Sequence, residues 1–264
     1  MTVGVAPLTI LQLSDLHLFD QSQQNLLGLN TNYSLQQILK VVKGLQHQLD
    51  IILLTGDLAQ DASAGAYQSL IQLFSGISVP VYFVPGNHDQ PELMTATLTS
   101  KPFHSEQVFS LGGWQFILLD SSIPDQVHGA LSPETLTKLD TTLNACNQPT
   151  TLALHHPAHP AQSDWLDDGL ENYEALWSVL DRHPQVQIVL SGHVHQEMTF
   201  SRRGVQYLTT PSTCIQFKPR SATFALDKND PGFRLLTLFA DGSFQSWVER
   251  VPISQQANLN AAGY

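Results

Sequence analysis

The chain has 264 residues, of which 42% are hydrophobic and 13% charged, and its formal net charge is −11. This length allows one domain with a sizeable core, and the composition is that of an ordered globular protein. The acidic balance disfavours a nucleic-acid-binding scaffold, because such scaffolds are basic. We therefore expect a single domain over residues 1–264, with a polar tail at 254–264 that frays.

Apolar residues nowhere form the run of about 18 that a membrane-spanning helix needs, and Met1–Phe19 lacks the basic start of a secretion signal. These observations predict a cytoplasmic protein without a membrane partner, as a monomer or a homodimer. The two cysteines, Cys146 and Cys214, lack CxxC or zinc-ribbon spacing. Both are interpreted as reduced core thiols.

Short apolar segments alternate with amphipathic ones up to His195, as buried strands alternate with helices in α/β proteins. In chain order we predict a strand at Leu8–Leu13, a helix along Leu35–Leu45 with Ser34 as its N-cap, a strand at Ile51–Leu54, a helix along Tyr67–Phe74, strands at Val79–Val84 and Trp114–Leu119, a helix opened by Ser132-Pro133-Glu134, a strand at Thr151–Leu154, a helix at Asp168–His183 and a strand at Val186–Leu190.

After His195 the pattern changes to alternating strands separated by turn residues. The predicted strands are Glu197–Arg203, Val205–Leu208, Phe233–Phe239 and Phe244–Val251. We interpret this part as a C-terminal β meander within the same domain. The expected fold class is α/β, with a largely parallel sheet continued by antiparallel strands.

Residues with metal-binding side chains follow five of the predicted buried strands. They are Asp15-Leu16-His17, Gly56-Asp57, Gly86-Asn87-His88-Asp89, His155-His156 and Gly192-His193-Val194-His195. Each motif taken alone could be an ordinary turn. Together they indicate a site, because the carboxyl ends of parallel strands meet at one edge of a sheet.

Carboxylate and amide oxygens combined with imidazoles favour Mn, Fe or Zn in octahedral or five-coordinate sites. A structural tetrahedral zinc site is the weaker alternative, because thiolates are absent from the set. The His193-Val194-His195 pair could present both rings on one face of an extended segment. We prefer a turn after Gly192 that directs the two rings to two different ions.

In this order, the D-x-H, G-D, G-N-H-D, lone His and G-H-x-H motifs resemble the full motif set of the calcineurin-like metallophosphoesterases. The resemblance implies a sandwich of mixed β-sheets flanked by helices, with two divalent metal ions, Fe or Mn before Zn. It assigns Asp15, His17, Asp57 and His195 to the first ion. The second ion is assigned Asp57, Asn87, His155 and His193, so that Asp57 bridges the two.

A more extended resemblance is to the bacterial class III 3′,5′-cyclic-AMP phosphodiesterases. The stretches that carry it are Ser14–Leu18, Pro85–Asp89, His128-Gly129, His155–Pro157 with Ser163–Asp167, and Thr210–Pro219. It implies hydrolysis of cyclic AMP to 5′-AMP, with a metal-bridging hydroxide as the nucleophile. The alternatives are the same chemistry on a glycerophosphodiester, a 2′,3′-cyclic nucleotide or a phosphoprotein, and a non-catalytic scaffold of the same fold.

The resemblance also implies roles around the metals. His88 resembles the family's catalytic histidine, which binds the phosphoryl group and protonates the leaving alkoxide. Asp89 either orients that imidazole as a second catalytic residue or is a simple turn carboxylate. Because two dications outweigh the carboxylates of Asp15 and Asp57, the centre attracts a phosphodiester despite the acidic chain.

The predicted substrate-binding residues are Asn87, His88, His128, His195 and Phe217. His128 either contacts the substrate or has a structural place beside Gly129. The segment Thr210–Arg220 is the candidate cap over the base. Phe217 or Cys214 would be its apolar contact, and Lys218 or Arg220 would supply charge. The alternative is an ordinary packed loop.

Overall fold

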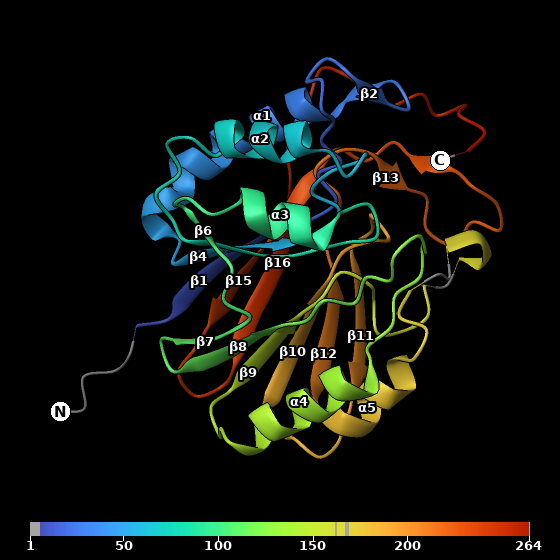
Figure 1. Ribbon diagram of the computed structural model, residues 1–264. Helices are drawn as coiled ribbons and strands as arrows, with labels where there is room; N and C mark the ends of the chain where they lie inside the picture. The colour runs from blue at the N-terminus through green and yellow to red at the C-terminus, as the bar shows by residue number, and fades with distance from the viewer. Residues whose placement is uncertain (1–5, 162, 167–168, 264) are drawn as a thin grey trace.

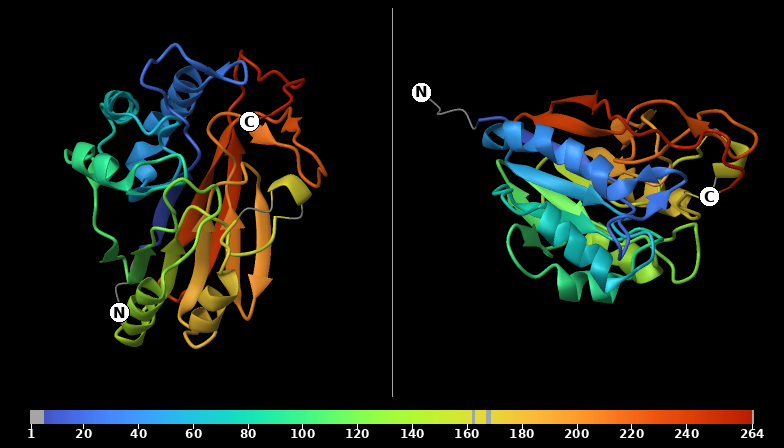
Figure 2. Two further views of the ribbon diagram at one scale, coloured as in Figure 1. Left: turned by 45° about the vertical axis from the view of Figure 1, so that its right-hand side comes forward. Right: turned by 90° about the horizontal axis from the view of Figure 1, so that it is seen from above.

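Two six-stranded sheets lie face to face, and helices cover the outer face of each (Figures 1 and 2). This arrangement is seen in a computed structural model that describes residues 6–161, 163–166 and 169–263. The central strands are covered on both faces, which is why they are almost continuously apolar in sequence. The fold is the predicted α/β sandwich of mixed sheets.

The first sheet has the order β16-β15-β1-β4-β5-β6. Strands β1 (Leu8–Leu13), β4 (Ile51–Thr55), β5 (Val81–Val84) and β6 (Phe103–His104) pair in parallel. β15 (Gly232–Leu238) pairs antiparallel with β1, and β16 (Phe244–Arg250) pairs antiparallel with β15. Its outer face packs against α1 (Thr31–Leu45), α2 (Ala64–Leu73) and α3 (Pro91–Thr97). A 3-10 turn, η1 (Gln46–Gln48), follows α1.

The second sheet has the order β11-β12-β10-β9-β8-β7. Its strands are β7 (Val108–Leu111), β8 (Trp114–Leu118), β9 (Thr150–Ala153), β10 (Val186–Ser191), β11 (Met198–Arg202) and β12 (Val205–Thr209). Its outer face packs against α4 (Pro133–Asn144) and α5 (Tyr173–Leu180). The remaining elements are the pairs β2 (Asn25–Leu26) with β3 (Leu29–Asn30) and β13 (Gln216–Phe217) with β14 (Leu226–Asp227), and the 3-10 turn η2 (Asp164–Leu166).

The strand periodicity separates two layers of the core. Along β1, Leu8 and Ile10 point between the sheets, while Leu11 and Leu13 point to the helices. Trp114 and Phe116 of the second sheet fill the same inter-sheet layer. The tight contact of the two sheets brings the carboxyl ends of β1, β4 and β5 close to those of β9 and β10.

The six predicted central strands are present to within one or two residues. The start of the first helix differs from the prediction. Asn30 is its N-cap, and its side-chain oxygen accepts a hydrogen bond from Tyr33 N at 2.6 Å. Ser34 is instead buried one turn inside α1, where its hydroxyl donates to Thr213 O at 2.6 Å.

The four C-terminal strands are also present, but they form two hairpins in different sheets. The β11–β12 hairpin extends the second sheet, where β12 runs parallel to β10. Residues 210–231 then cross to the first sheet, and β15 pairs with β1. Strand alternation predicted the hairpins but carried no information on which sheet each one joins.

The fourth predicted helix is shorter in the structure, as α5 begins at Tyr173 and ends at Leu180. Its predicted first residue, Asp168, lies outside the described residues. The tail expected to fray is mostly exposed in its described part, but it touches the rest of the chain: Asn258 N donates to Leu27 O at 2.7 Å, and Ala257 joins an apolar cluster. Both cysteines are free thiols, and no helix within the described ranges is long and apolar enough to cross a membrane.

Candidate metal centre

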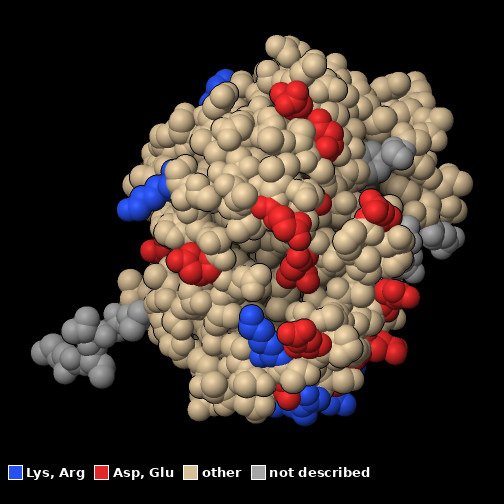
Figure 3. Space-filling model, viewed as in Figure 1, with Lys and Arg blue, Asp and Glu red and all other residues tan. Residues whose placement is uncertain are grey.

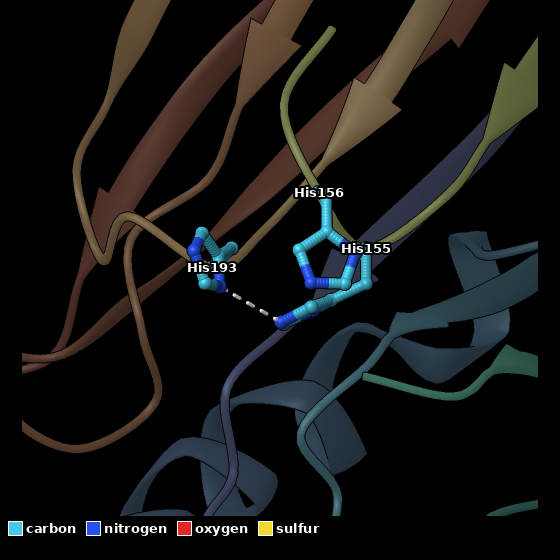
Figure 4. Close-up of side chains that lie close together, drawn as sticks. All are labelled: His155, His156 and His193. Atoms are coloured by element: carbon cyan, nitrogen blue, oxygen red, sulfur yellow. Dashed lines mark hydrogen bonds between the residues drawn. The ribbon is translucent and has the colours of Figure 1, made fainter. Parts of the chain in front are cut away.

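The five predicted motifs converge where the two sheets meet. Asp15 and His17 follow β1, Asp57 follows β4 and Asn87 follows β5. From the second sheet, His155 follows β9, and His193 and His195 follow β10. All of these side chains are buried except Asn87, which is half-buried. Figure 4 shows His155 and His193 approaching each other from the two neighbouring loops.

The backbone turns sharply at these strand ends. Asp15, His17, Asp57, His193 and His195 all have positive φ angles, between 48° and 70°. Residues other than glycine adopt that conformation uncommonly, although Asp and His do so more often than most. Five such residues in one centre indicate that the surrounding structure holds these turns. The N–H groups of Leu16 and His17 both donate to Asp57 O, at 2.8 and 2.9 Å, which fixes the first loop against the second.

Gly56 makes the approach of the two sheets possible. It has a φ of +92°, and a β-carbon there would lie 2.4 Å from Nδ1 of His155. Any larger residue would displace that ring.

The first group of donors consists of Asp15, His17 and His195, with Asp57 beside it. Nε2 of His17 lies 3.1 Å from Nε2 of His195 and 3.7 Å from Oδ2 of Asp57. Nε2 of His195 lies 3.5 Å from Oδ1 of Asp15. Because Nδ1 of His195 donates to Ile215 O at 2.9 Å, Nε2 carries the lone pair that a metal would use.

The second group of donors consists of Asp57, Asn87, His155 and His193. Nε2 of His155 lies 3.3 Å from Oδ2 of Asp57, 3.1 Å from Oδ1 of Asn87 and 3.3 Å from Nδ1 of His193. Oδ1 of Asn87 is also 3.1 Å from Nδ1 of His193. Nδ1 of His155 donates to Thr55 O at 2.8 Å, so Nε2 is the nitrogen that a metal would bind. Oδ2 of Asp57 therefore faces both groups.

Burial and neighbouring charges shift the pKa values of these residues away from their ordinary values. Burial raises the pKa of Asp15 to about 7 and lowers that of His17 to about 3. Burial acts to lower the pKa of His155, but the charge of Asp57 raises it to about 9. Buried carboxylates need a compensating cation, and a protonated His155 supplies one here. The donor set thus fits divalent metal ions, which would replace that proton.

His156 has a role that the sequence did not indicate. It lies close enough to His155 and His193 to complete a three-imidazole group. However, its Nδ1 bonds the Ser121 hydroxyl at 2.8 Å, and its Nε2 lies 3.0 Å from Val127 O. Both ring nitrogens therefore hold the loop that carries His128.

His128 itself is at the rim of the site. Its side chain is 36% exposed, and Nε2 lies 3.6 Å from the carboxylate of Glu171. The neighbouring Gly129 has no room for a side chain, because a β-carbon there would be 2.2 Å from Nδ1 of His156. The buried contacts of His156 thus hold the loop in place, and His128 lies on its partly exposed side.

The carboxylate of Asp89 lies between the Asp57 loop and the Asn87 loop. It accepts hydrogen bonds from the backbone N–H groups of Leu58, Ala59 and Gly86, at 2.9 to 3.0 Å, and from the hydroxyl of Tyr67 at 3.1 Å. Burial raises the pKa of Asp89 to about 6. These contacts join the Asp57 loop to the Asn87 loop, as a turn carboxylate would. The alternative role of Asp89, orienting the imidazole of His88, stays a prediction.

Phe217 lies in a packed loop, the stated alternative to a contact with the base. Its ring is 2% exposed and stacks on the imidazole of His195, with a centroid distance of 4.3 Å and an interplanar angle of 14°. Trp165 covers it edge-on at 5.0 Å. A base cannot stack on a ring buried in this way. The segment Thr210–Arg220 lies behind the centre, where the Ser212 hydroxyl donates to Asp15 O at 2.7 Å.

Acidic side chains outnumber basic ones in the chain, whose formal net charge is −11. Figure 3 shows Asp and Glu side chains in a broken line down the middle of one face, with Lys and Arg toward its edges and lower part. An anionic substrate therefore requires a local positive charge at the centre, which bound metal ions would provide.

Comparisons with known proteins agree with this geometry. Residues 8–197 match the family described as calcineurin-like phosphoesterase. A 3′,5′-cyclic-nucleotide phosphodiesterase of Nostoc sp. is 42% identical over 94% of this chain and 94% of its own. The 3′,5′-cyclic adenosine monophosphate phosphodiesterase CpdA of Escherichia coli is 41% identical over 99% of this chain and 96% of its own.

Among solved structures, a dimetal phosphatase from Danio rerio superposes with a TM-score of 0.64 at 18% identity, over 94% of this chain and 100% of that one. A purple acid phosphatase from yellow lupin superposes with a TM-score of 0.65 at 16% identity, over 95% of this chain and 53% of that one. These likenesses concern the fold alone. With the family match and the two close relatives, they lead to one conclusion: the chain belongs to the calcineurin-like phosphoesterase family.

Proposed function

We propose that the chain hydrolyses 3′,5′-cyclic AMP to 5′-AMP at a dinuclear metal centre. The observation that carries the proposal is the position of Asp57, whose Oδ2 faces both donor groups, at 3.7 Å from His17 and 3.3 Å from His155. A carboxylate in that position can bridge two ions. The names of the relatives from Nostoc sp. and Escherichia coli support a cyclic nucleotide as the substrate.

The proposed ligands of the first ion are Asp15, His17, Asp57 and His195, and those of the second are Asp57, Asn87, His155 and His193. Oxygen donors mixed with imidazoles favour Mn or Fe, with Zn as a further candidate. When bound, two such ions would polarise the phosphoryl group, activate water and offset the acidic surroundings.

The protein's own residues position the diester and handle the proton. Asn87 directs its Oδ1 toward His155 and His193, so its N–H2 group is oriented to donate to a phosphoryl oxygen. His88, the next residue, binds the phosphoryl group and protonates the leaving O3′. His128, exposed at the rim, contacts the nucleotide.

The direct test is product analysis with metal-loaded wild-type protein. Mn- and Fe-loaded samples would be given cyclic AMP, cyclic GMP, 2′,3′-cyclic AMP, a glycerophosphodiester and bis(p-nitrophenyl) phosphate. We expect 5′-AMP from cyclic AMP, and loss of that activity after chelation. Cleavage of another diester without any 5′-AMP release from cyclic AMP would contradict the proposed substrate, and metal-replete protein inactive on all of them would contradict catalysis.

A further inference from the structure

Two supports of His195 come from neighbouring residues of one short segment. Its Nδ1 donates to Ile215 O at 2.9 Å, and its ring lies against that of Phe217. Gln216 stands between these two supports and is 3% exposed, although none of the motifs assigns its side chain a function. The position of His195 therefore depends on what fixes this segment.

The carboxamide of Gln216 faces backbone oxygens of its own segment. Its Nε2 lies 2.8 Å from Ser212 O, 3.1 Å from Ile215 O and 3.2 Å from Cys214 O. Carbonyl oxygens only accept hydrogen bonds, so the N–H2 group shares its two hydrogens among them and Oε1 points away. One of the three is the oxygen that orients His195.

Arg250 of β16 agrees with this orientation from the other end of the carboxamide. Its Nη1 donates to Oε1 of Gln216 at 2.8 Å and to Asp230 O at 2.7 Å. A guanidinium only donates hydrogen bonds, so Oε1 is the atom that faces it. Arg250 pairs with Gly232 of β15, and Gly232 N donates to Ser212 O at 3.1 Å. The segment is therefore tied to the β15–β16 hairpin of the first sheet.

Loss of the N–H2 group would leave three buried backbone oxygens close together without that donor. This arrangement is unfavourable, because buried carbonyl oxygens need donors and their partial negative charges repel. The segment would then shift, and Ile215 O would move away from Nδ1 of His195. A ring without that bond is less well oriented and binds a metal less tightly.

We propose that Gln216 is a positioning residue for the first metal ion: its carboxamide holds Ile215 O against Nδ1 of His195, and Arg250 anchors that carboxamide to the first sheet. A ligand from the second sheet is thus supported by the C-terminal hairpin of the first. This role rests on the proposed function, because it concerns a ligand of the metal centre given there.

The test measures Mn²⁺ affinity by competition with a fluorescent chelator, in the absence of substrate. Gln216→Met keeps the length of the side chain but removes the amide. It should bind the first ion about tenfold more weakly, at the lower end of the usual range for groups that support a ligand. Arg250→Met should weaken it about threefold, because the N–H2 contacts remain. Arg250→Lys keeps a cationic donor for Oε1 and should restore most of that loss.

Two backgrounds assign the effect to one ion. His155→Ala removes a ligand of the second ion only, so Gln216→Met should still weaken binding of the remaining ion. His195→Ala removes the supported ring, and Gln216→Met should then have almost no additional effect.

Gln185→Met is the matched control. Nε2 of Gln185 also donates to two backbone oxygens, at 2.8 and 3.0 Å, but these belong to Leu143 and Cys146 near the end of α4. The variant loses bonds of the same kind and should leave both metal affinities unchanged.

An unchanged first site in Gln216→Met, equal weakening at both sites, or equal weakening by Gln185→Met would overturn the inference. If Gln216→Met does not fold, the Arg250 variants decide: wild-type affinity in Arg250→Met, or no recovery in Arg250→Lys, would overturn it as well. The proposed function is judged separately, on whether wild-type protein releases 5′-AMP.

Discussion

The two sheets contribute different chemistry to one centre. The first sheet supplies both carboxylates, Asp15 and Asp57, together with an amide and one imidazole. The second sheet supplies imidazoles only, from His155, His193 and His195. The negative charge of the site and its shared ligand therefore come from one sheet, while the other completes the coordination with neutral groups.

Hydrogen bonds to groups of the first sheet also hold the ligands of the second sheet in place. His155 of the second sheet is oriented by Thr55 O of the first, and the N–H of His193 donates to the carboxylate of Asp15. Below them, the buried side chain of Gln12 donates to the Thr55 hydroxyl and to Ser191 O, each at 3.0 Å. The centre thus depends on the register between the sheets, which these hydrogen bonds fix.

The largest expected effect tests whether the shared metal ligand comes from the first sheet and the second sheet supplies unshared ligands. Asp57→Ala should lose both ions and lower kcat/KM by about 10³-fold or more, because a buried charge partner is worth about 3–5 kcal/mol. His155→Ala, its matched variant from the second sheet, should lose one ion of the two. Elemental analysis and steady-state kinetics measure both. Two ions retained in Asp57→Ala, or both lost in His155→Ala, would show that Asp57 is not the shared ligand.

The second effect separates metal ligands from the residue beside them. His88→Ala should keep both ions but lose about 10²- to 10⁴-fold in kcat for cyclic AMP, the usual range for general acid catalysis. Bis(p-nitrophenyl) phosphate, with its better leaving group, should be affected less. If both substrates suffer equally with both ions in place, His88 binds the phosphoryl group without acting as its acid.

The convergence of the motifs could be predicted from sequence, because each follows a buried strand and parallel strands end at the same edge. The contacts that orient the ligands and the neighbouring His88 could not. Thr55 O, Ile215 O and Gln60 O act through backbone carbonyls, which every residue has, so residue identity gives no signal. Ser34 shows the converse. Its side chain is of the type that caps helices, but it is buried inside α1 and its hydroxyl donates to Thr213 O.

Phe217 shows a second limit of sequence reasoning. An aromatic residue in a C-terminal loop is compatible with a base platform and with a buried support, and only packing distinguishes them. Residues 212 and 213 hydrogen-bond to the Asp15 loop, which draws the segment behind the centre and places the ring on His195. The side chain that looked suited to substrate therefore supports a ligand.

A third prediction follows from that stack. Phe217→Leu should weaken metal binding at the first site by about 10- to 100-fold, the usual cost of disturbing the support of a ligand. Phe224→Leu is the control, since Phe224 packs on Phe217 in the same apolar cluster. Metal titration should show weaker binding for Phe217→Leu alone, with activity on cyclic AMP and on the nitrophenyl diester recovering together at saturating metal. Selective loss of cyclic AMP hydrolysis at saturating metal would instead restore the base-contact interpretation.

The smallest effect concerns the hydrogen bonds of Tyr67 between the Asp57 and Asn87 loops. The hydroxyl of Tyr67 donates to Asp89 at 3.1 Å and accepts from Gln90 N at 3.0 Å. Burial raises the pKa of Tyr67 above its ordinary value, so the hydroxyl stays protonated and remains a donor. Tyr67→Phe removes this bond, while the three backbone N–H donors to Asp89 remain.

We therefore expect Tyr67→Phe to lower the free energy of unfolding by about 1.5–3 kcal/mol, as for a hydrogen bond to a charged acceptor, while kcat changes less than about fivefold. Tyr33→Phe is the matched control, because the Tyr33 hydroxyl bonds the exposed hydroxyl of Ser254 at 2.8 Å and should contribute less. Urea unfolding of the two variants makes the comparison. If Tyr67→Phe lowers the free energy of unfolding no more than Tyr33→Phe does, the backbone donors alone hold the loops. If its kcat instead falls as far as that of His88→Ala, the hydrogen bonds of Tyr67 position the catalytic ring directly.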